Sequence, residues 1–251
     1  MSGHSKWATI KRKKGAADAK RGQVFTRLTR EIVMSAREGG GDTDSNFRLR
    51  LAIEKARSQN MPKENIERAI KRGTGESKDG SVFEQVFYEG YAPHGVALMI
   101  ECFTENRNRT VAEVRHVLTR AGGTLGEAGS VGWQFKRAAY FSVPGTENDM
   151  EKIFDLAVFG GADDVNYDDG YIEIIGPVES FKTISDALRQ GKCTLEEAEL
   201  RMLPTNEIDL GTEETLQVLR SVESLEELDD VQNVFHNLHI SEEALASLAE
   251  E

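Results

Sequence analysis

A polar segment without hydrophobic periodicity, TGESKDGS at residues 74–81, divides the chain into two parts that follow different patterns. Before this segment, apolar residues recur every three or four positions, which is typical of amphipathic helices. After it, short apolar runs bounded by Gly, Pro and Asp alternate with helical stretches, which is typical of sheets combined with helices. A chain of 251 residues with such a break is expected to form more than one domain.

The first part predicts three helices that follow a basic amino-terminal arm. A helix over residues 23–37 places its apolar side chains on one side, and the glycines after Glu38 end it. A second helix lies within NFRLRLAIEKARSQN, with Asp44 or Ser45 as its cap, and a third runs from Pro62 to Gly73. Residues 1–75 are therefore predicted to be an arm and a small helical domain. The apolar stripe of the first helix is Val24, Phe25, Leu28 and Ile32.

The second part predicts two α/β domains. Two strands around a Gly/Pro turn and a helix over NRTVAEVRHVLTRAGG form a β-β-α unit. Residues 133–204 then read β-α-β-β-α-β, the order of the ferredoxin-like split unit. The helix, strand and helix that follow are too few for a core of their own, so they are expected to complete the first unit. The predicted elements after residue 133 are strand 138–143, helix 150–159, strands 163–167 and 171–175, helix 178–189, strand 195–203, helix 212–225, strand 231–236 and helix 242–248.

The predicted fold class is therefore α+β and multidomain. It combines an N-terminal helical domain with two α/β domains, one of them ferredoxin-like and inserted in the other. The predicted boundaries are 1–75 for the arm and helical domain, 80–132 with 205–251 for one α+β domain, and 133–204 for the inserted domain.

Charge is distributed unevenly along the chain. The formal net charge is −12, but residues 1–72 hold 18 Lys and Arg against 8 Asp and Glu, a net of +10. The remaining residues hold 13 against 35, a net of −22. A basic end raises the local concentration of polyanions while an acidic remainder repels them, so a phosphate backbone is the expected class of partner.

The arm carries the strongest signal for nucleic-acid contact. Cations neutralise phosphates and release counterions, and the indole of Trp7 can stack on an exposed base. The alternative is a solvated tail in which Trp7 and Ile10 pack on the helical domain. The predicted binding residues here are Lys6, Trp7, Lys11, Arg12, Lys13 and Lys14.

Two further groups of cations are candidates for phosphate contact. On the helix over 23–37, the side opposite the apolar stripe is basic, although an ordinary solvated face has the same pattern. Arg107 and Arg109 stand where a strand ends and a helix begins, so guanidinium groups and helix N-terminal amides together favour an anion. The alternative for these two is that Asn106 or Asn108 caps the helix and the arginines pair with Glu101, Glu105 or Glu113. The basic face of the first helix is Lys20, Arg27, Arg30 and Arg37.

Other motifs are interpreted as structural. AGGTLGEAGSVGW lacks the order of a phosphate-binding or dinucleotide-binding loop and predicts a mobile turn. DDVNYDDG predicts a hairpin with its turn at Asp169-Gly170. Cys102 and Cys193 lie in apolar, strand-like runs and are interpreted as reduced core residues. The five histidines are scattered without a nucleophile pattern, so no catalytic site, metal site or cofactor is expected.

The chain is also expected to be soluble and cytoplasmic. No apolar run approaches the roughly 18 residues of a membrane span, and no apolar block follows the basic start as in a secretory signal. No membrane and no small-molecule substrate is expected among its partners, and a monomer is favoured.

Five long stretches together closely resemble the YebC/PmpR family, whose mitochondrial members are translational activators of cytochrome c oxidase. The resemblance covers most of the chain from Ser2 to about Val222. Phe47 stands where Pro is expected and Arg12 where His is common, but neither change removes a cation or a stacking group. The stretches are GHSKWATIKRKKGAADAKRGQVFTRLTREI, RLRLAIEKARSQNMPKENIERAIKRGTGE, EGYAPHGVA, ENRNRTVAEVRHVLTRAGGTLGEAGSVGW and LRMLPTNEIDL.

This resemblance implies three domains in a clamp-like body and a non-enzymatic regulator of gene expression. In bacteria the family implies a DNA-binding transcriptional regulator that docks on phosphate backbones. Its alternative role is a ribosome-associated translation factor that contacts rRNA or tRNA, and the lack of an evident helix-turn-helix in residues 15–73 favours recognition of shape or RNA. The family pattern includes Lys6, Trp7, Lys11, Lys13, Lys20, Arg21, Arg27, Arg48, Arg50, Arg107 and Arg109.

Overall fold

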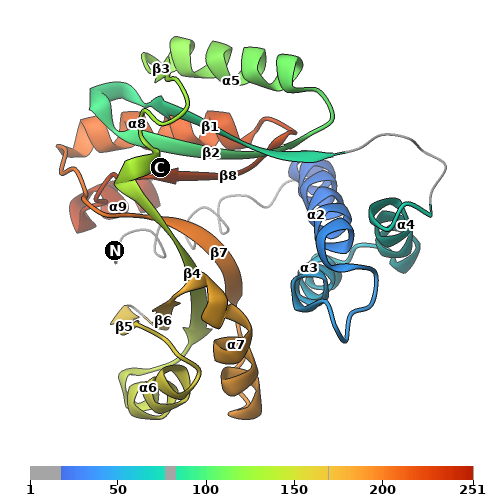
Figure 1. Ribbon diagram of the computed structural model, residues 1–251. Helices are drawn as coiled ribbons and strands as arrows, with labels where there is room; N and C mark the ends of the chain where they lie inside the picture. Colours follow the sequence, from blue (N-terminus) through green and yellow to red (C-terminus); the bar gives the residue numbers. More distant parts are fainter. Residues whose placement is uncertain (1–17, 77–82, 169, 251) are drawn as a thin grey trace.

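The structure, a computed structural model, describes residues 18–76, 83–168 and 170–250, and the side chains of 22–76, 83–168 and 170–248. It is a multidomain α+β fold with a helical amino-terminal part and two antiparallel four-stranded sheets (Figure 1). We refer to the sheets as sheet A and sheet B. The limits predicted for three domains stay a prediction.

The helical part consists of α2 (Asp18–Gly39), α3 (Phe47–Ser58) and α4 (Lys63–Gly73). Ile32 of α2 and Leu49 of α3 are fully buried in one core, and Val24 and Phe25 pack against it half-buried. The predicted apolar stripe of the first helix is thereby confirmed.

The predicted cap of α3 is wrong, because Asn46 takes that place. Its Oδ1 accepts from the Leu49 amide at 3.0 Å, while its Nδ2 donates to the Ser35 carbonyl of α2 at 2.7 Å. Asp44 and Ser45 lie in the preceding turn, where the Asp44 amide and the Ser45 hydroxyl both donate to the Asp42 carboxylate. An amide side chain both accepts and donates, so Asn46 caps one helix and ties it to another.

Sheet A has the strand order β3-β1-β2-β8. On β2, Leu98, Ile100 and Cys102 join a core with helices α5, α8 and α9, while Ala97 and Met99 alternate with them and join a different cluster. The helices therefore cover one face of this sheet. The elements are β1 (Glu84–Tyr91), β2 (Ala97–Thr104), α5 (Arg107–Ala121), β3 (Thr124–Leu125), α8 (Thr212–Glu226), β8 (Val231–His236) and α9 (Glu242–Glu250).

Sheet B has the order β5-β6-β4-β7, and its strands lie in the chain between β3 and β8. Its core joins β4 and β6 with α6 and α7, and Phe141 and Ile184 are fully buried there. The β-α-β-β-α-β element order predicted for this stretch is confirmed. The elements are β4 (Phe135–Pro144), α6 (Met150–Phe159), β5 (Asp164–Asp168), β6 (Tyr171–Gly176), α7 (Phe181–Gln190) and β7 (Glu197–Pro204).

The two sheets meet through an apolar cluster. Phe135 of β4 and Met202 of β7 pack with Ala97 and Met99 of β2 and with Phe235 of β8. We call this cluster the joint. It lies on the face of sheet A opposite α5, α8 and α9.

The helical part contacts both sheet units. Phe83 and Phe103 of the first unit lie in the helical core. On the other side, the ring of Phe47 lies 5.5 Å from that of Phe181, and the Arg189 guanidinium lies 5.1 Å from the Phe47 ring and 2.9 Å from Glu54. Phe47, the residue that departs from the family pattern, therefore holds the helical part against α7.

Two interpretations of local sequence need correction. The Gly-rich stretch before β4 is more than a turn, because Thr124 and Leu125 pair with Tyr91 and Gly90 as strand β3. Cys193 lies between α7 and β7 rather than in a strand, and it is half-buried. Cys102 is confirmed as a core residue of β2, where burial raises the pKa of its thiol to about 12.

No helix among the described residues is long and apolar enough to cross a membrane. The same residues contain no group of three His, Cys, Asp or Glu side chains arranged to hold a metal ion.

The buried imidazole of His236 predicts loss of stability in acid. Burial lowers the pKa of His236 to about 4. As the pH falls, this imidazole is therefore protonated near pH 6.5 in the unfolded chain but only near pH 4 in the folded chain. The free energy of unfolding is therefore expected to fall by about 3 kcal/mol from this group between pH 7 and pH 4. Urea titrations of His236→Gln should show a smaller fall over that range. The control is His116→Gln on the exposed side of α5, and an equal fall in wild type and His236→Gln would contradict the assignment.

Candidate nucleic-acid interface

The residues of the predicted arm lie outside the described part of the chain. These are Lys6, Trp7, Lys11, Arg12, Lys13 and Lys14, and the side chains of Lys20 and Arg21 lie outside it as well. Their role in binding stays a prediction. The described interface therefore begins with the cations of α2.

The side of α2 opposite its apolar stripe is not a free cationic surface. Arg30 is 9% exposed, so the expectation that it faces solvent is wrong. Burial lowers the pKa of Arg27, partly opposed by the charge of Asp229. Arg37 donates to the Phe83 carbonyl at 2.5 Å. The reason is tertiary: residues of the sheet A unit, with acidic Asp229 and Asp230 among them, lie against this side of the helix.

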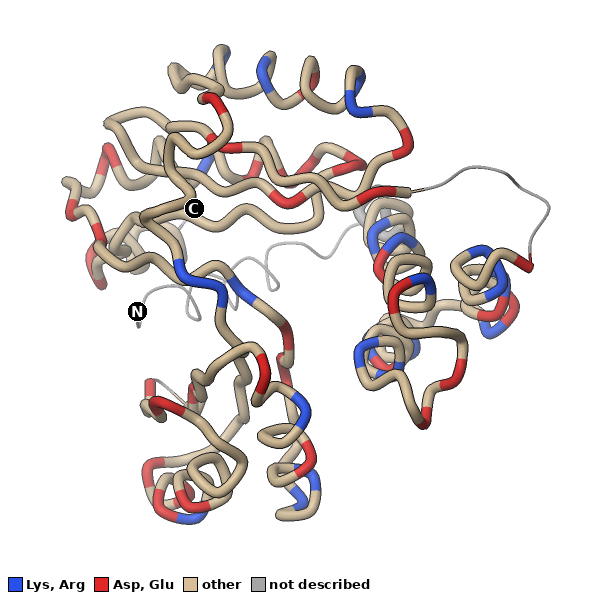
Figure 2. Tube along the Cα trace, in the orientation of Figure 1, with Lys and Arg blue, Asp and Glu red and all other residues tan. Residues whose placement is uncertain are grey.

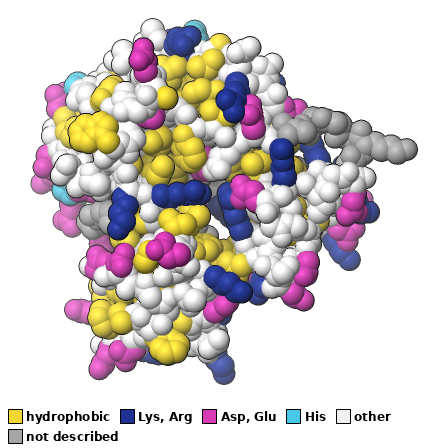
Figure 3. Space-filling model, viewed as in Figure 1, with side chains coloured by type: hydrophobic (Ala, Val, Ile, Leu, Met, Phe, Trp, Pro, Cys, Tyr) yellow, Lys and Arg dark blue, Asp and Glu magenta, His cyan; other side chains and the backbone are white. Residues whose placement is uncertain are grey.

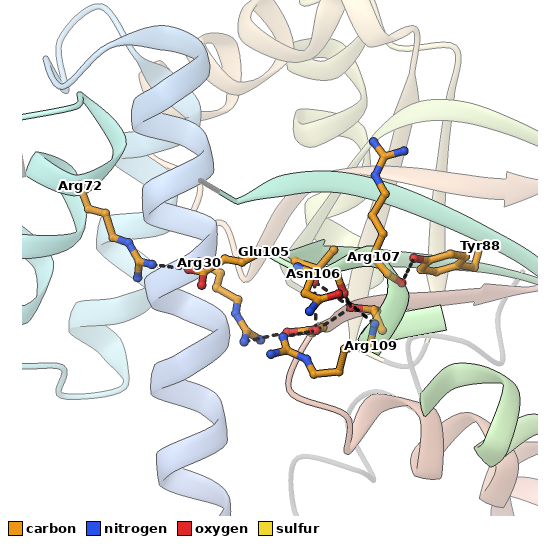
Figure 4. A network of polar contacts seen from close by, with 10 residues as sticks. Arg30, Arg72, Tyr88, Glu105, Asn106, Arg107 and Arg109 are labelled. Carbon is orange, nitrogen blue, oxygen red and sulfur yellow. Dashed lines mark hydrogen bonds and ion pairs between the residues drawn. The ribbon is translucent and has the colours of Figure 1, made fainter. Parts of the chain in front are cut away.

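Asp230 is the centre of a buried polar cluster that joins the helical part to sheet A (Figure 4). Its side chain is 2% exposed, and its two oxygens lie 2.9 Å from Arg30 and 2.7 Å from Arg109. Thr110 and Thr104 also donate to it, at 2.7 and 3.1 Å. Burial alone would raise the pKa of Asp230, but these hydrogen bonds and the two guanidinium charges outweigh it and hold that pKa below its ordinary value. We call these five residues the Asp230 cluster.

A second ion pair lies beside this cluster. Arg72 of α4 contacts the carboxylate of Glu105, and its guanidinium lies 4.4 Å from the Phe83 ring. Figure 4 shows Arg72 directed at Glu105, while Arg30 and Arg109 converge from α2 and α5. Cations of the helical part therefore serve to attach it to the sheet A unit.

At the N-terminus of α5, the structure agrees in part with the alternative in which an asparagine caps the helix and the two arginines pair with acidic residues. Asn106 caps the helix, since its Oδ1 accepts from the Arg109 amide at 3.1 Å. Arg107 donates twice to Glu84 at 2.6 Å, and Arg109 pairs with Asp230. The acidic partners are thus strand and loop residues distant in sequence. None of the three expected partners, Glu101, Glu105 and Glu113, forms these described pairs.

The two cations of α3 are also engaged. Arg48 pairs with Glu38 at 2.5 Å. Arg50 donates to the carbonyls of Thr43 and Asp44 at 2.9 and 3.1 Å, and its guanidinium lies 5.7 Å from the Phe47 ring. Both side chains help to fix the loop between α2 and α3.

Sequence reasoning missed several exposed cations for which the described structure shows no ion pair or side-chain hydrogen bond, and five of them bear on nucleic-acid binding. Three of these are exposed on α3 and α4, and two follow an exposed tryptophan at the start of β4. The available signal was the run GWQFKR, in which aromatic residues and two cations interrupt the otherwise acidic sequence of residues 73–251, which we call the trunk. Figure 2 shows Lys and Arg positions at the upper end of β4 and along the helices of the amino-terminal part. The residues are Arg57, Arg68 and Lys71, and Lys136 and Arg137 after Trp133.

Comparison with known families covers nearly the whole chain. A profile described as the TACO1/YebC protein N-terminal domain matches residues 5–76. A profile described as the TACO1/YebC second and third domain matches residues 83–238. The two matches meet at the polar segment that divides the sequence.

Individual relatives are similar over their full length. A "probable transcriptional regulatory protein" of Chloroherpeton thalassium is 51% identical over 99% of both chains. One from Borrelia turicatae is 50% identical over 97% of this chain and 99% of the relative. A crystal structure of a conserved hypothetical protein from Aquifex aeolicus is 43% identical with a TM-score of 0.81, covering 90% of this chain and 93% of the other.

Proposed function

The chain belongs to the YebC/PmpR family, and from that membership we propose that it is a nucleic-acid-binding regulator of gene expression. In this proposal its basic amino-terminal part docks on the phosphate backbone of DNA. The role is non-enzymatic, needs no cofactor and is placed in the cytoplasm.

The observation that carries the proposal is the division of charge. A net of +10 in residues 1–72 precedes a net of −22 in the rest of the chain. Such a molecule is attracted to a polyanion through one end and repelled along the remainder, which orients it on the backbone. Because many cations of α2 are consumed by contacts within the protein, the proposal rests on the arm and on the exposed cations of α3 and α4.

The exposed cations of the helical part suit backbone contact rather than base readout. Arg57, Arg68 and Lys71 are exposed, and the described structure gives their side chains no carboxylate partner. Each can displace a counterion from a phosphate, which contributes affinity without sequence preference. The proposal does not rely on the cations of the Asp230 cluster, since a phosphate would have to displace a buried carboxylate from them.

A second candidate function is a ribosome-associated translation factor that contacts rRNA or tRNA. The observation in its favour is Trp133, an indole that is 71% exposed. Such a ring can stack on bases that are splayed out of an RNA loop, whereas the bases of a duplex are covered by their neighbours.

The test is the affinity of the full chain for nucleic acid as a function of salt. A 25-base-pair DNA duplex and an RNA hairpin with an open loop are titrated over about 50 to 300 mM salt, where log K is expected to fall linearly with log salt. Tighter binding to the duplex supports the transcriptional role, and tighter binding to the hairpin supports the translational one. Affinity weaker than about 10⁻⁴ M for both at low salt would overturn the proposal.

A further inference from the structure

We propose that Trp133, Lys136 and Arg137 form a second nucleic-acid contact, which holds an unpaired nucleotide by stacking and by charge. This inference rests on the proposed class of ligand. It adds a site outside the amino-terminal part, at the joint between the two sheets.

Trp133 is displayed rather than packed. It lies in the short helical turn Gly132–Gln134, its side chain is 71% exposed, and its Nε1 donates to the Ser130 carbonyl at 3.1 Å. Tryptophan is normally among the more buried residues, because its ring has a large apolar area. Because the only hydrogen-bond donor of the indole is already bonded to the protein, the two faces of the ring can act as apolar surfaces.

The loop that carries this indole is fixed in place. The Glu89 carboxylate accepts from the amides of Gly129, Val131 and Gly132, each at 2.7 Å. Burial would raise the pKa of Glu89, but the three amides outweigh it and lower that pKa, so the carboxylate stays charged. Buried Val131 precedes the indole. A preorganised ring loses little conformational entropy when a base stacks on it.

Phe135 anchors the other side of the turn. It is 8% exposed and belongs to the joint, and the Gln134 carbonyl between it and Trp133 accepts from the Thr205 amide at 2.8 Å. The indole is therefore held between two apolar anchors, one on each side in sequence.

Two exposed cations follow the indole closely in the sequence. Lys136 and Arg137 are exposed, and the described structure shows no ion pair or side-chain hydrogen bond for either. They lie three and four residues after Trp133, so their Cα atoms are within about 14 Å of it. Consecutive strand residues point to opposite faces, so the two cations lie on both sides of β4.

The local charge differs from that of the surrounding trunk. Glu127 is the only acidic residue in the sequence from 126 to 144, whereas residues 73–251 as a whole have a net charge of −22. Figure 3 shows Lys and Arg side chains across the middle of the molecule, between the sheet A unit above and the sheet B unit below. The two cations outnumber the one acidic residue of this stretch, and the charge of the nearby Glu89 carboxylate is held by three loop amides, so the stretch favours a polyanion more than the remaining acidic sequence does.

The chemistry selects an unpaired nucleotide over a protein segment. In the sequence around Trp133, the apolar neighbours Val131 and Phe135 are buried, whereas Lys136 and Arg137 are exposed. A flat ring with two nearby cations matches one exposed base and its adjoining phosphates. A base in duplex cannot offer its face without being unstacked.

Fluorescence of a single tryptophan tests the contact directly. The chain has two tryptophans, so Trp7→Phe leaves Trp133 as the sole indole. Titration of this variant with an unstructured 12-nucleotide single-stranded RNA is expected to quench the indole emission, and a duplex of the same sequence is expected to quench it much less. Binding that proceeds without quenching would overturn the inference.

Substitution gives an independent measurement. Trp133→Ala is expected to weaken binding of the single strand by about 5- to 100-fold, while Trp133→Phe retains most of it. Lys136→Gln with Arg137→Gln should reduce the salt slope by about 1 to 2. The control is Phe159→Ala, which removes an aromatic ring that is 87% exposed on α6. Normal affinity of Trp133→Ala would overturn the inference alone, whereas absence of any binding by wild type overturns the proposed function.

Discussion

Replacing Lys11, Arg12, Lys13 and Lys14 together by Gln is expected to lower the salt dependence of nucleic-acid binding by about 3 in the slope of log K against log salt. Each cation that neutralises a phosphate releases about 0.7 to 0.9 of a counterion, and the four together account for this change. Affinity at low salt should fall by several orders of magnitude, with the fold intact. Binding isotherms at four or more salt concentrations measure both quantities.

A matched variant separates the effect of phosphate contact by the arm from the effect of changing the total charge of the protein. Arg115, Arg120, Lys152 and Lys182 are exposed on α5, α6 and α7, and their replacement by Gln removes the same four charges from the trunk. This control should change the slope little, because those cations are not among the residues proposed to contact phosphate. Equal slopes for the arm variant and wild type would mean that the arm does not contact phosphate.

The Asp230→Asn variant is expected to lose about 3 to 5 kcal/mol in the free energy of unfolding. The substitution leaves Arg30, which is 9% exposed, without the charge that compensates it inside the protein. Arg109 loses less, since half of its side chain is exposed and water can solvate it. Urea denaturation followed by circular dichroism measures the loss as a lower midpoint.

Two variants make this measurement specific. Asp229→Asn alters the exposed neighbour and should cost less than about 1 kcal/mol. Combining Asp230→Asn with Arg30→Met should recover much of the stability, because an apolar side chain replaces the uncompensated cation. A midpoint that Asp230→Asn leaves unchanged would show that the cluster contributes nothing to the attachment of α2.

The sequence predicted those elements whose apolar pattern is set locally. Met150–Phe159 and Val231–His236 match their predicted bounds, and every predicted helix and strand with a clear apolar period is present. Strong local signals suffice here because each element buries the side that its own sequence makes apolar. Short β3 has only two residues and depends on its pairing with β1, so no local period could indicate it.

The candidate site was less predictable, because whether each cation is exposed or paired depends on contacts with residues distant in sequence. Arg30 has the spacing of an exposed cation on α2, yet its partner lies 200 positions later at Asp230. Arg107 and Arg109 likewise meet Glu84 and Asp230 rather than nearby acids. Trp133 shows the converse, since nothing in its local pattern indicates that a ring between two buried residues lies outside the core.

The three parts of the described structure touch one another in pairs. The helical part meets sheet A at the Asp230 cluster and meets α7 through Phe47, and the two sheets meet at the joint. If one of these three interfaces were missing, a part could rotate about a single hinge. With all three interfaces formed, such a rotation is blocked. Rotation of any one part has to break two interfaces at once, so the distance between Trp133 and the exposed cations of α3 and α4 is expected to stay nearly constant.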